Sequence, residues 1–346
     1  MSGWKVTSIR LITIFKCYLS GAGYLIQTHR KILHVSYRLN KREWGQTTLP
    51  KMKLLFSKKG QNKTNWLQFL LILNVSALSA TVVQGQSSSP VNRIIENLFQ
   101  DSPAIGTFTR TPETDIDFTV IDEQYGEFDI NDVRKVLVDM RVDNRPPIVA
   151  PIVRIPLAAR DAPQDVVRLL LDAGVFGIMF PDIETQEQAT AAIGSMRFPQ
   201  PVDAADQVPP GLRGSGSGSA PGYWGTNEEE YRTQADVWPL DPAGKLVAMI
   251  QIESLTGIRA LNEILEVPGI GVIFLGPTDL ASSTGAEGPN APTVEALVQE
   301  VLQVCLARNI PCGYPIVANS HQEAERETAR RLAEGFKVLA VMTRAQ

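Results

Sequence analysis

The chain has 346 residues, of which 44% are hydrophobic and 20% are charged, and its formal net charge is −4. This is the composition of a soluble globular protein with one large domain or two ordinary ones, and it excludes disorder of the whole chain. Three cysteines exclude a disulfide scaffold, and three histidines leave little for a histidine metal cluster. The slightly negative charge argues against a nucleic-acid partner.

The charge is unevenly distributed along the chain. Residues 1–86 carry thirteen Lys or Arg and a single acid, Glu43, whereas the remainder holds 20 basic and 36 acidic residues. Such an asymmetry indicates that two physically different parts have been joined.

Residues 52–85 have the pattern of a signal peptide. Four lysines precede an apolar run at 67–73, and small residues follow at 76–80. Cleavage is expected near Ala80 or after Gly85. The run is shorter than the roughly 20 residues of a membrane span, so no stable span is expected after its removal; an uncleaved anchor is the alternative. Use of the signal predicts export to the periplasm or medium, and otherwise the protein is cytoplasmic.

The remaining domain boundaries follow from the same pattern. We interpret residues 1–51 as a basic upstream extension and Met52 as the biological start, which N-terminal sequencing of the native protein would test. Residues 86–103 are expected to form a linker and an N-terminal helix, and residues 104–346 the main folded domain.

From residue 104 onward, short β-branched or apolar runs alternate with apolar residues at helical spacing, such as those at 166–171 and 294–306. Sequences typical of capping boxes begin at Thr185 and Ser320, and Gly174 and Gly335 stand where helices would end. The eight predicted strands are 104–109, 118–123, 148–156, 177–183, 247–254, 271–279, 311–317 and 337–344.

Eight strands separated by helices predict a parallel sheet, and eight is the number that closes a (β/α)8 TIM barrel. An open doubly wound sheet is the alternative, although no Gly-x-Gly-x-x-Gly turn follows the first strand. The chain stops at Gln346, directly after the eighth strand, so the eighth helix is expected to be absent.

A Gly-, Ser- and Pro-rich insertion at 209–224 interrupts the alternation between the fourth and fifth strands. Its composition predicts that no compact element forms there. Because Tyr223, Trp224, Tyr231 and Trp238 lie in it or nearby, we interpret it as a functional loop, with a plain flexible insertion as the alternative.

In a parallel barrel the reacting groups come from the C-terminal ends of different strands. Two carboxylates at such ends, Glu253 and Asp279, suit Mg²⁺ or Mn²⁺, which prefer oxygen ligands. Helix capping and a surface ion pair are the alternative roles for these two residues. The polar residues at the predicted strand ends are Glu123, Arg154, Asp182, Gln251, Glu253 and Asp279.

Arg154 lies inside an otherwise apolar strand. A buried guanidinium needs an anionic partner, which a carboxylate substrate beside a divalent cation would provide. A structural ion pair with Glu253 or Asp122 is the alternative.

Several motifs together resemble the HpcH/HpaI aldolase and citrate lyase family, most closely its 2-keto-3-deoxy acid aldolase branch. The likeness extends over about residues 91–344, and the stretch 223–242 looks like an exported subgroup. The motifs are Pro-Ile-Val-Arg-Ile-Pro at 151–156, Asp-Ala-Gly-Val-Phe-Gly-Ile-Met-Phe-Pro at 172–181, Pro-Pro-Gly-Leu-Arg-Gly at 209–214, Gln-Ile-Glu at 251–253 and Leu-Gly-Pro-Thr-Asp-Leu at 275–280.

The resemblance implies a barrel of the phosphoenolpyruvate/pyruvate type and metal-assisted carbon–carbon bond cleavage that yields pyruvate or a related keto acid. Glu253 and Asp279 would hold Mg²⁺ or Mn²⁺, with Co²⁺ as a further option. Arg154 would stabilise the enolate that forms as the bond breaks. The residues that would contact the keto acid are Arg154 and Gln251, assisted by the backbone around Gly276, Pro277 and Thr278.

The sequence departs from the family where the aldolases carry Asp-x-Glu-His. Here the stretch is Asp122-Glu123-Gln124-Tyr125, and a tyrosine, with an ordinary pKa of about 10, is a poor base. A hydroxide on the metal, Glu123 or His321 are alternative bases.

Two functions therefore remain open. The first is an active lyase with an altered substrate, and the second is an inactive homologue that binds a small keto acid. In both cases the expected partners are a small keto acid and further copies of the chain in a homo-oligomer.

Overall fold

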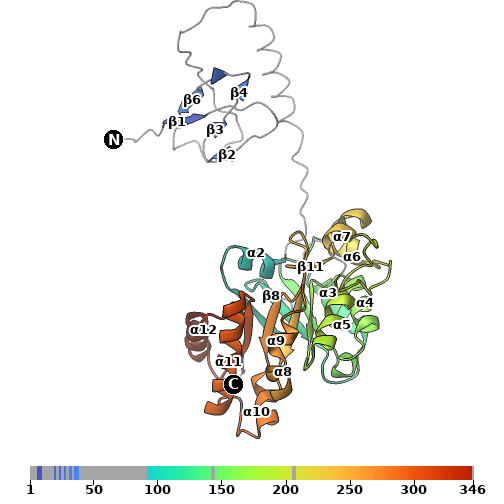
Figure 1. The fold of residues 1–346 in the computed structure, drawn as a ribbon, viewed down its shortest axis with the longest axis vertical. Coiled ribbons are helices and arrows are strands. Elements are labelled where there is room, and N and C mark those ends of the chain that lie inside the picture. The colour runs from blue at the N-terminus through green and yellow to red at the C-terminus, as the bar shows by residue number, and fades with distance from the viewer. Residues whose placement is uncertain are drawn as a thin grey trace, which may run out of the picture. The chain divides into compact units, whose positions relative to one another are not determined.

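The structure is a computed structural model, which describes residues 92–344 apart from 112, 142–144 and 205–207, and the backbone of six short strands before them (Figure 1). The chain divides into two compact units, Met1–Gly85 and Gln86–Gln346. In the first unit three antiparallel pairs form, β1 with β6, β2 with β3 and β4 with β5. These strands are β1 Val6–Ile9, β2 Leu19–Ser20, β3 Gly23–Tyr24, β4 Gln27–Thr28, β5 Lys31–Ile32 and β6 Val35–Arg38. The predicted signal peptide lies outside the described residues.

In the second unit, eight parallel strands close into a barrel. The hydrogen-bonded order is β10-β9-β8-β7-β15-β14-β13-β12, and pairing of β10 with β12 completes the ring. The eight strands predicted from the sequence are all present, and the predicted (β/α)8 barrel is confirmed. They are β7 Ala104–Phe108, β8 Phe118–Asp122, β9 Ala150–Arg154, β10 Gly177–Phe180, β12 Leu246–Ile252, β13 Val272–Leu275, β14 Cys312–Ala318 and β15 Val338–Thr343, with a short extra strand β11, Val237–Trp238, beside β12.

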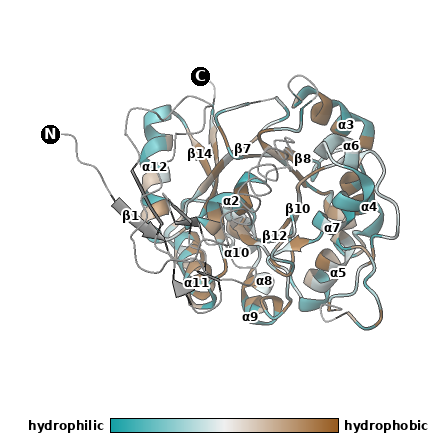
Figure 2. Cartoon of the chain, turned by 90° about the horizontal axis from the view of Figure 1, so that it is seen from above, coloured by the Kyte–Doolittle hydropathy of each residue, from teal (hydrophilic) through white to brown (hydrophobic). Residues whose placement is uncertain are grey.

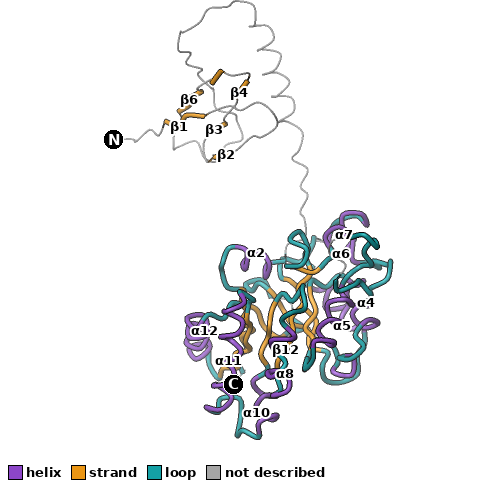
Figure 3. The backbone as a smooth tube through the Cα atoms, in the orientation of Figure 1, coloured by secondary structure: helices purple, strands orange, loops and turns teal. Residues whose placement is uncertain are grey.

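Helices surround the barrel on its outer side (Figure 3), and the view from above places α3 to α7 on one side of it and α11 and α12 on the other (Figure 2). None of the helices in the described part of the chain combines the length and apolar character that crossing a membrane requires. They are α2 Arg93–Phe99, α3 Ile130–Asp139, η1 Leu157–Ala159, α4 Gln164–Ala173, α5 Gln186–Met196, α6 Ala220–Trp224, α7 Glu228–Gln234, α8 Leu255–Arg259, α9 Leu261–Ile264, α10 Pro277–Thr284, α11 Pro292–Arg308 and α12 His321–Glu334.

Local sequence explains several helix ends. Thr185 begins α5 with a complete capping box, in which its side chain accepts from the Gln188 N–H and the Gln188 side chain accepts from the Thr185 N–H. At α12 only half of the predicted box forms, because Glu323 accepts from the Asn319 N–H instead. Gly174 ends α4 with a φ of 112°, which is a left-handed conformation that favours glycine.

The predicted sixth strand, 271–279, is too long. β13 ends at Leu275, Gly276 caps the next helix, and Pro277 occupies the first position of α10. Proline is favoured at that position because its fixed φ suits a helix and its missing N–H is not needed there. Asp279 therefore lies in the first turn of α10 rather than at the end of a strand.

The interpretation of the 209–224 insertion needs two corrections. It contains a short helix, α6, and it packs at the N-terminal end of the barrel strands (Figure 1), whereas α8 and α10 follow the C-terminal ends. Trp224 is fully buried, stacks on Phe176 with ring centroids 4.6 Å apart and donates to the Gly174 carbonyl at 2.8 Å. Composition predicted a loop, but the aromatic residues anchor the segment in the core.

This packing predicts a large stability effect far from any chemistry. Trp224→Ala removes a stacked, hydrogen-bonded indole, and we expect a loss of about 3–5 kcal/mol in the free energy of unfolding. Urea denaturation followed by circular dichroism measures it. Val202→Ala is the control, because Val202 is 91% exposed, and it should change stability by less than about 0.5 kcal/mol. Equal stability of both variants would contradict the packing of the insertion.

Candidate active site

The predicted site residues meet at the C-terminal end of the barrel. Arg154 is the last residue of β9, and Gln251 lies in β12 with Glu253 directly after it. Asp279 lies in the first turn of α10, which follows the neighbouring strand β13, and its charge acts on Glu253 and on Tyr125. The closed parallel sheet thus brings together groups that are up to 125 positions apart in the sequence.

Glu253 is held from two sides. Only 2% of the residue is exposed; Oε1 accepts from the Asp182 N–H at 2.8 Å, and Oε2 accepts from the Gln251 amide nitrogen at 3.0 Å. Because a carboxylate oxygen has two lone pairs, each oxygen keeps a free acceptor position.

The electrostatic environment of Glu253 is unfavourable for a bare carboxylate. Burial, followed by the negative charge of Asp279, raises the pKa of Glu253 to about 7, although Arg154 acts in the opposite direction. A divalent cation would stabilise such a pair, in which a buried carboxylate and a partly exposed one repel each other.

Gly276 makes room for this carboxylate. A Cβ at position 276 would overlap Oε2 of Glu253 and lie 2.6 Å from its Cβ, far inside van der Waals contact. The glycine is therefore required by the close approach of β12 and the start of α10.

Gly276→Ala should displace the Glu253 carboxylate and reduce divalent-metal affinity and lyase activity by at least about tenfold, since a displacement of about 1 Å costs much of a site's function. Isothermal titration with Mn²⁺ and a turnover assay measure the two effects. Gly288→Ala is the matched control, because a Cβ there meets no atom within 4 Å. If Gly276→Ala leaves both Mn²⁺ affinity and turnover unchanged, the position of the Glu253 carboxylate does not matter for metal binding or activity.

Arg154 pairs with Asp122. Its Nε and Nη2 donate to the two carboxylate oxygens at 2.8 and 2.5 Å, which is the ion pair that the sequence left open as an alternative. The guanidinium carbon lies 5.0 Å from the ring centroid of Phe108 and 5.7 Å from that of Tyr125. Asp122 and Phe108 thus fix the orientation of the guanidinium.

Tyr125 belongs to the same cluster. Most of its side chain is exposed, yet partial burial and the charge of Asp279 raise the pKa of its phenol above the ordinary value. The phenol therefore stays protonated near neutral pH, a state in which it can donate a hydrogen bond but is a poor base.

The two other candidate bases, Glu123 and His321, also follow the C-terminal ends of barrel strands. The side chain of Glu123 is buried and forms an ion pair with Arg110, and its other charged neighbours are Asp122 and Asp132. Burial raises the pKa of Glu123, and its backbone N–H donates to the Arg154 carbonyl at 2.9 Å. His321 is exposed at the first position of α12, after β14.

The donor set fits a hard divalent cation that keeps water or substrate as its other ligands. Within residues 92–344, leaving aside the few undescribed positions, no group of three His, Cys, Asp or Glu side chains is arranged around a metal position. The charges of two carboxylates, Glu253 and Asp279, act on each other, and the buried Oε1 of Gln251, whose amide nitrogen donates to Glu253, lacks a hydrogen-bond partner. Mg²⁺ in proteins is commonly held by one or two carboxylates in this way.

Sequence reasoning gave no role to Arg160 and none to the backbone of Asp182. Arg160 Nη1 donates to Asp182 Oδ2 at 2.7 Å, and Asp182 has a φ of 49°. Asp182 was among the predicted candidates because it stands at the end of a strand. No pattern in the sequence predicted its left-handed backbone conformation.

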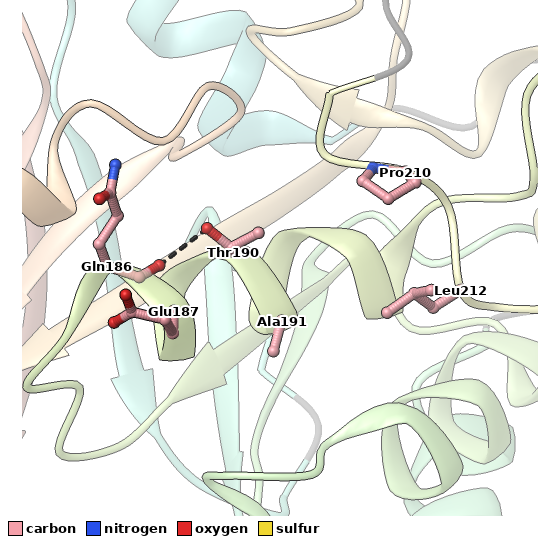
Figure 4. A pocket seen from close by; sticks show the side chains of 6 residues that line it. All are labelled: Gln186, Glu187, Thr190, Ala191, Pro210 and Leu212. Atoms are coloured by element: carbon pink, nitrogen blue, oxygen red, sulfur yellow. Dashed lines mark hydrogen bonds between the residues drawn. The ribbon is translucent and has the colours of Figure 1, made fainter.

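A shallow pocket of about 300 Å³ lies elsewhere, between α5 and the 210–212 segment (Figure 4). Its walls are mostly apolar, and Glu187 is the single titratable residue among those that line it. None of the predicted site residues lines this pocket.

With this geometry established, comparison with known proteins identifies the family. The model of the HpcH/HpaI aldolase/citrate lyase family matches residues 108–343, which is more than half of the chain. The chain belongs to this family, so the resemblance seen in the sequence is confirmed at that level.

Among curated relatives, 5-keto-4-deoxy-D-glucarate aldolase of Salmonella paratyphi A is 28% identical over 239 residues, covering 64% of this chain and 84% of the relative. Hydroxypyruvate/pyruvate aldolase of Cupriavidus necator is 31% identical over 198 residues, covering 57% of this chain and 65% of that protein. The relatives support a carbon–carbon lyase.

Among solved structures, an HpcH/HpaI aldolase/citrate lyase family protein from Burkholderia cenocepacia J2315 has a TM-score of 0.59 and 25% identity, covering 73% of this chain and 93% of that one. An HpcH/HpaI aldolase from Desulfitobacterium hafniense DCB-2 has a TM-score of 0.56 at 20% identity, covering 72% and 89% of the two chains. The second likeness concerns the fold alone.

Proposed function

We propose that this protein is a divalent-metal-dependent aldolase that cleaves a 2-keto-4-hydroxy acid into pyruvate, or a related keto acid, and an aldehyde. Membership of an aldolase and lyase family supports the reaction type. The observation that carries the proposal is the buried Glu253 beside Asp279, where the charge of the second carboxylate contributes to a pKa of about 7 for the first.

Glu253 and Asp279 would hold the cation. A divalent cation bound there supplies Lewis-acid polarisation of the substrate's keto group. The buried Oε1 of Gln251 can accept a hydrogen bond from a water or a substrate hydroxyl at the same place. These three side chains orient the keto-acid end of the substrate.

Arg154 would bind and stabilise the substrate's oxygens. Asp122 occupies Nε and Nη2, and among the described residues Nη1 has no acceptor, which leaves it for a substrate oxygen. A guanidinium fixed in advance stabilises the negative charge that develops on the enolate without reorganising. Tyr125 lies next to the guanidinium of Arg154, and its protonated phenol would donate a hydrogen bond to the aldehyde half of the substrate.

The experiment is pyruvate release, coupled to lactate dehydrogenase, from a panel of 4-hydroxy-2-keto acids of the 2-keto-3-deoxy acid class. We expect turnover with Mg²⁺, Mn²⁺ or Co²⁺ and none in EDTA. Turnover that is unaffected by EDTA would contradict the metal-dependent mechanism.

A second candidate is a keto-acid-binding homologue without turnover. The protonated Tyr125 favours it, because the family's histidine base is replaced by a donor. It predicts that oxalate raises the melting temperature only when metal is present, while every lyase substrate fails. Cleavage of any substrate of the panel would exclude it.

A further inference from the structure

Asp182 has an unusual backbone at the edge of the site. Its φ of 49° lies in the left-handed region, which asparagine, aspartate and glycine adopt more readily than other residues. Its N–H donates to Glu253 Oε1 at 2.8 Å, and the next N–H, of Ile183, donates to the Gln251 carbonyl at 3.1 Å.

These two consecutive N–H groups therefore point toward the same neighbouring strand, β12. In an extended strand successive N–H groups point to opposite sides, so the regular conformation of β10 would satisfy only one of these acceptors. The left-handed residue permits both bonds, and one of them holds the buried carboxylate.

Arg160, in the turn after β9, fixes this conformation from the outside. Its Nη1 donates to Asp182 Oδ2 at 2.7 Å and to the Asp182 carbonyl at 3.4 Å, and it lies 3.5 Å from Glu184 Oε2. The carboxylate of Asp182 is thus engaged by a guanidinium, while its backbone N–H faces the site.

We infer that Asp182, held by Arg160, is a positioning residue that orients the Glu253 carboxylate for the divalent cation. The inference rests on the proposed function, and it assigns Asp182 a role through its backbone instead of a role as a third carboxylate ligand. Any residue that adopts the left-handed backbone conformation should therefore substitute for Asp182 without loss of metal binding, whatever its side chain.

The test is Mn²⁺ binding to the full chain, followed by the electron paramagnetic resonance signal of free Mn²⁺, with circular dichroism to confirm folding. Asp182→Gly and Asp182→Asn should bind Mn²⁺ within about threefold of the parent, whereas Asp182→Ala should bind about tenfold more weakly, as the cost of a left-handed alanine implies. If Asp182→Gly and Asp182→Asn lose as much Mn²⁺ affinity as Asp182→Ala, the inference is overturned, because the Asp182 carboxylate itself would then bind the metal. Unchanged Mn²⁺ binding in Asp182→Ala would overturn it too.

Arg160 provides an independent arm. Arg160→Ala should weaken Mn²⁺ binding about tenfold in the parent but have little effect in the Asp182→Gly background, because glycine adopts the conformation unaided. Arg168→Ala is the control, since Arg168 faces Asp172 at 3.9 Å, beside the C-terminal end of α4. An equal effect of Arg160→Ala in both backgrounds would overturn the inference. Failure of the proposed function looks different, because the parent itself would then bind no Mn²⁺.

Discussion

Glu253→Gln is expected to abolish lyase activity while making the metal-free protein more stable. The carboxylate has a pKa of about 7 in the folded protein and 4.5 as its ordinary value, so the folded state retains a proton that the unfolded chain has lost. Stability therefore falls as the pH rises from 4.5 to about 7, and above pH 7 the full cost, roughly 3 kcal/mol, applies. Glutamine has no charge to bury and removes this cost.

The local hydrogen bonds can survive the substitution. The amide oxygen of the introduced side chain would accept from the Asp182 N–H as Oε1 of Glu253 does now, and its nitrogen could donate to Gln251, whose Oε1 has no partner in the parent. We therefore expect the melting temperature of the metal-free variant at pH 8 to rise by roughly 5 °C. At pH 4.5, the ordinary pKa of a glutamate, the gain should vanish.

Activity should move in the opposite direction. Loss of one of two anionic ligands is expected to reduce pyruvate release by about 10³-fold or more, since Lewis-acid stabilisation contributes several kcal/mol. Differential scanning fluorimetry across pH and the coupled assay measure both effects. A variant that is less stable at pH 8, or one that retains turnover, would contradict the account of Glu253.

Tyr125→His should increase cleavage of a simple 4-hydroxy-2-keto acid by about 10²-fold. The phenol is protonated near neutral pH, because partial burial and Asp279 raise its pKa, whereas an imidazole with a pKa near about 6.5 can accept the proton of the 4-hydroxyl group. General base catalysis contributes typically about 10²–10⁴-fold, which sets the size of the effect.

Tyr125→Phe separates the two roles of the ring. It keeps the ring beside Arg154 but removes the donor, so turnover of the native substrate should fall by about tenfold, as the loss of a hydrogen bond implies. Steady-state kinetics of the parent and both variants on one substrate panel give the comparison. If histidine at this position leaves the cleavage rate unchanged, the base lies elsewhere in the protein.

The barrel could be predicted because its strands are apolar on both faces and are separated by helices with recognisable ends. Arg154, Gln251 and Glu253 could be found for the same reason, since each is a polar residue at the end of an apolar run, where parallel strands expose functional groups. Asp279 was found by the same rule, although Gly276 and Pro277 end the strand earlier and place it on a helix.

Contacts between distant segments were not predictable. The sequence left Glu253 and Asp122 open as partners of Arg154 and did not decide between them, and nothing in it indicates that Arg110 holds Glu123 or that Asp182 adopts a positive φ. The insertion was misread because its composition describes local flexibility, whereas its structure is determined by Trp224 packing on Phe176, 48 positions away. Such pairings depend on the tertiary structure.

The most direct measurement of the central claim is the stoichiometry of Mn²⁺ binding, followed by the resonance signal of the free ion. The parent chain is predicted to bind one Mn²⁺ tightly, and Glu253→Gln and Asp279→Asn are each predicted to lose that site while remaining folded. A parent that binds no Mn²⁺, or variants that bind it as tightly as the parent, would contradict a metal centre formed by these two carboxylates.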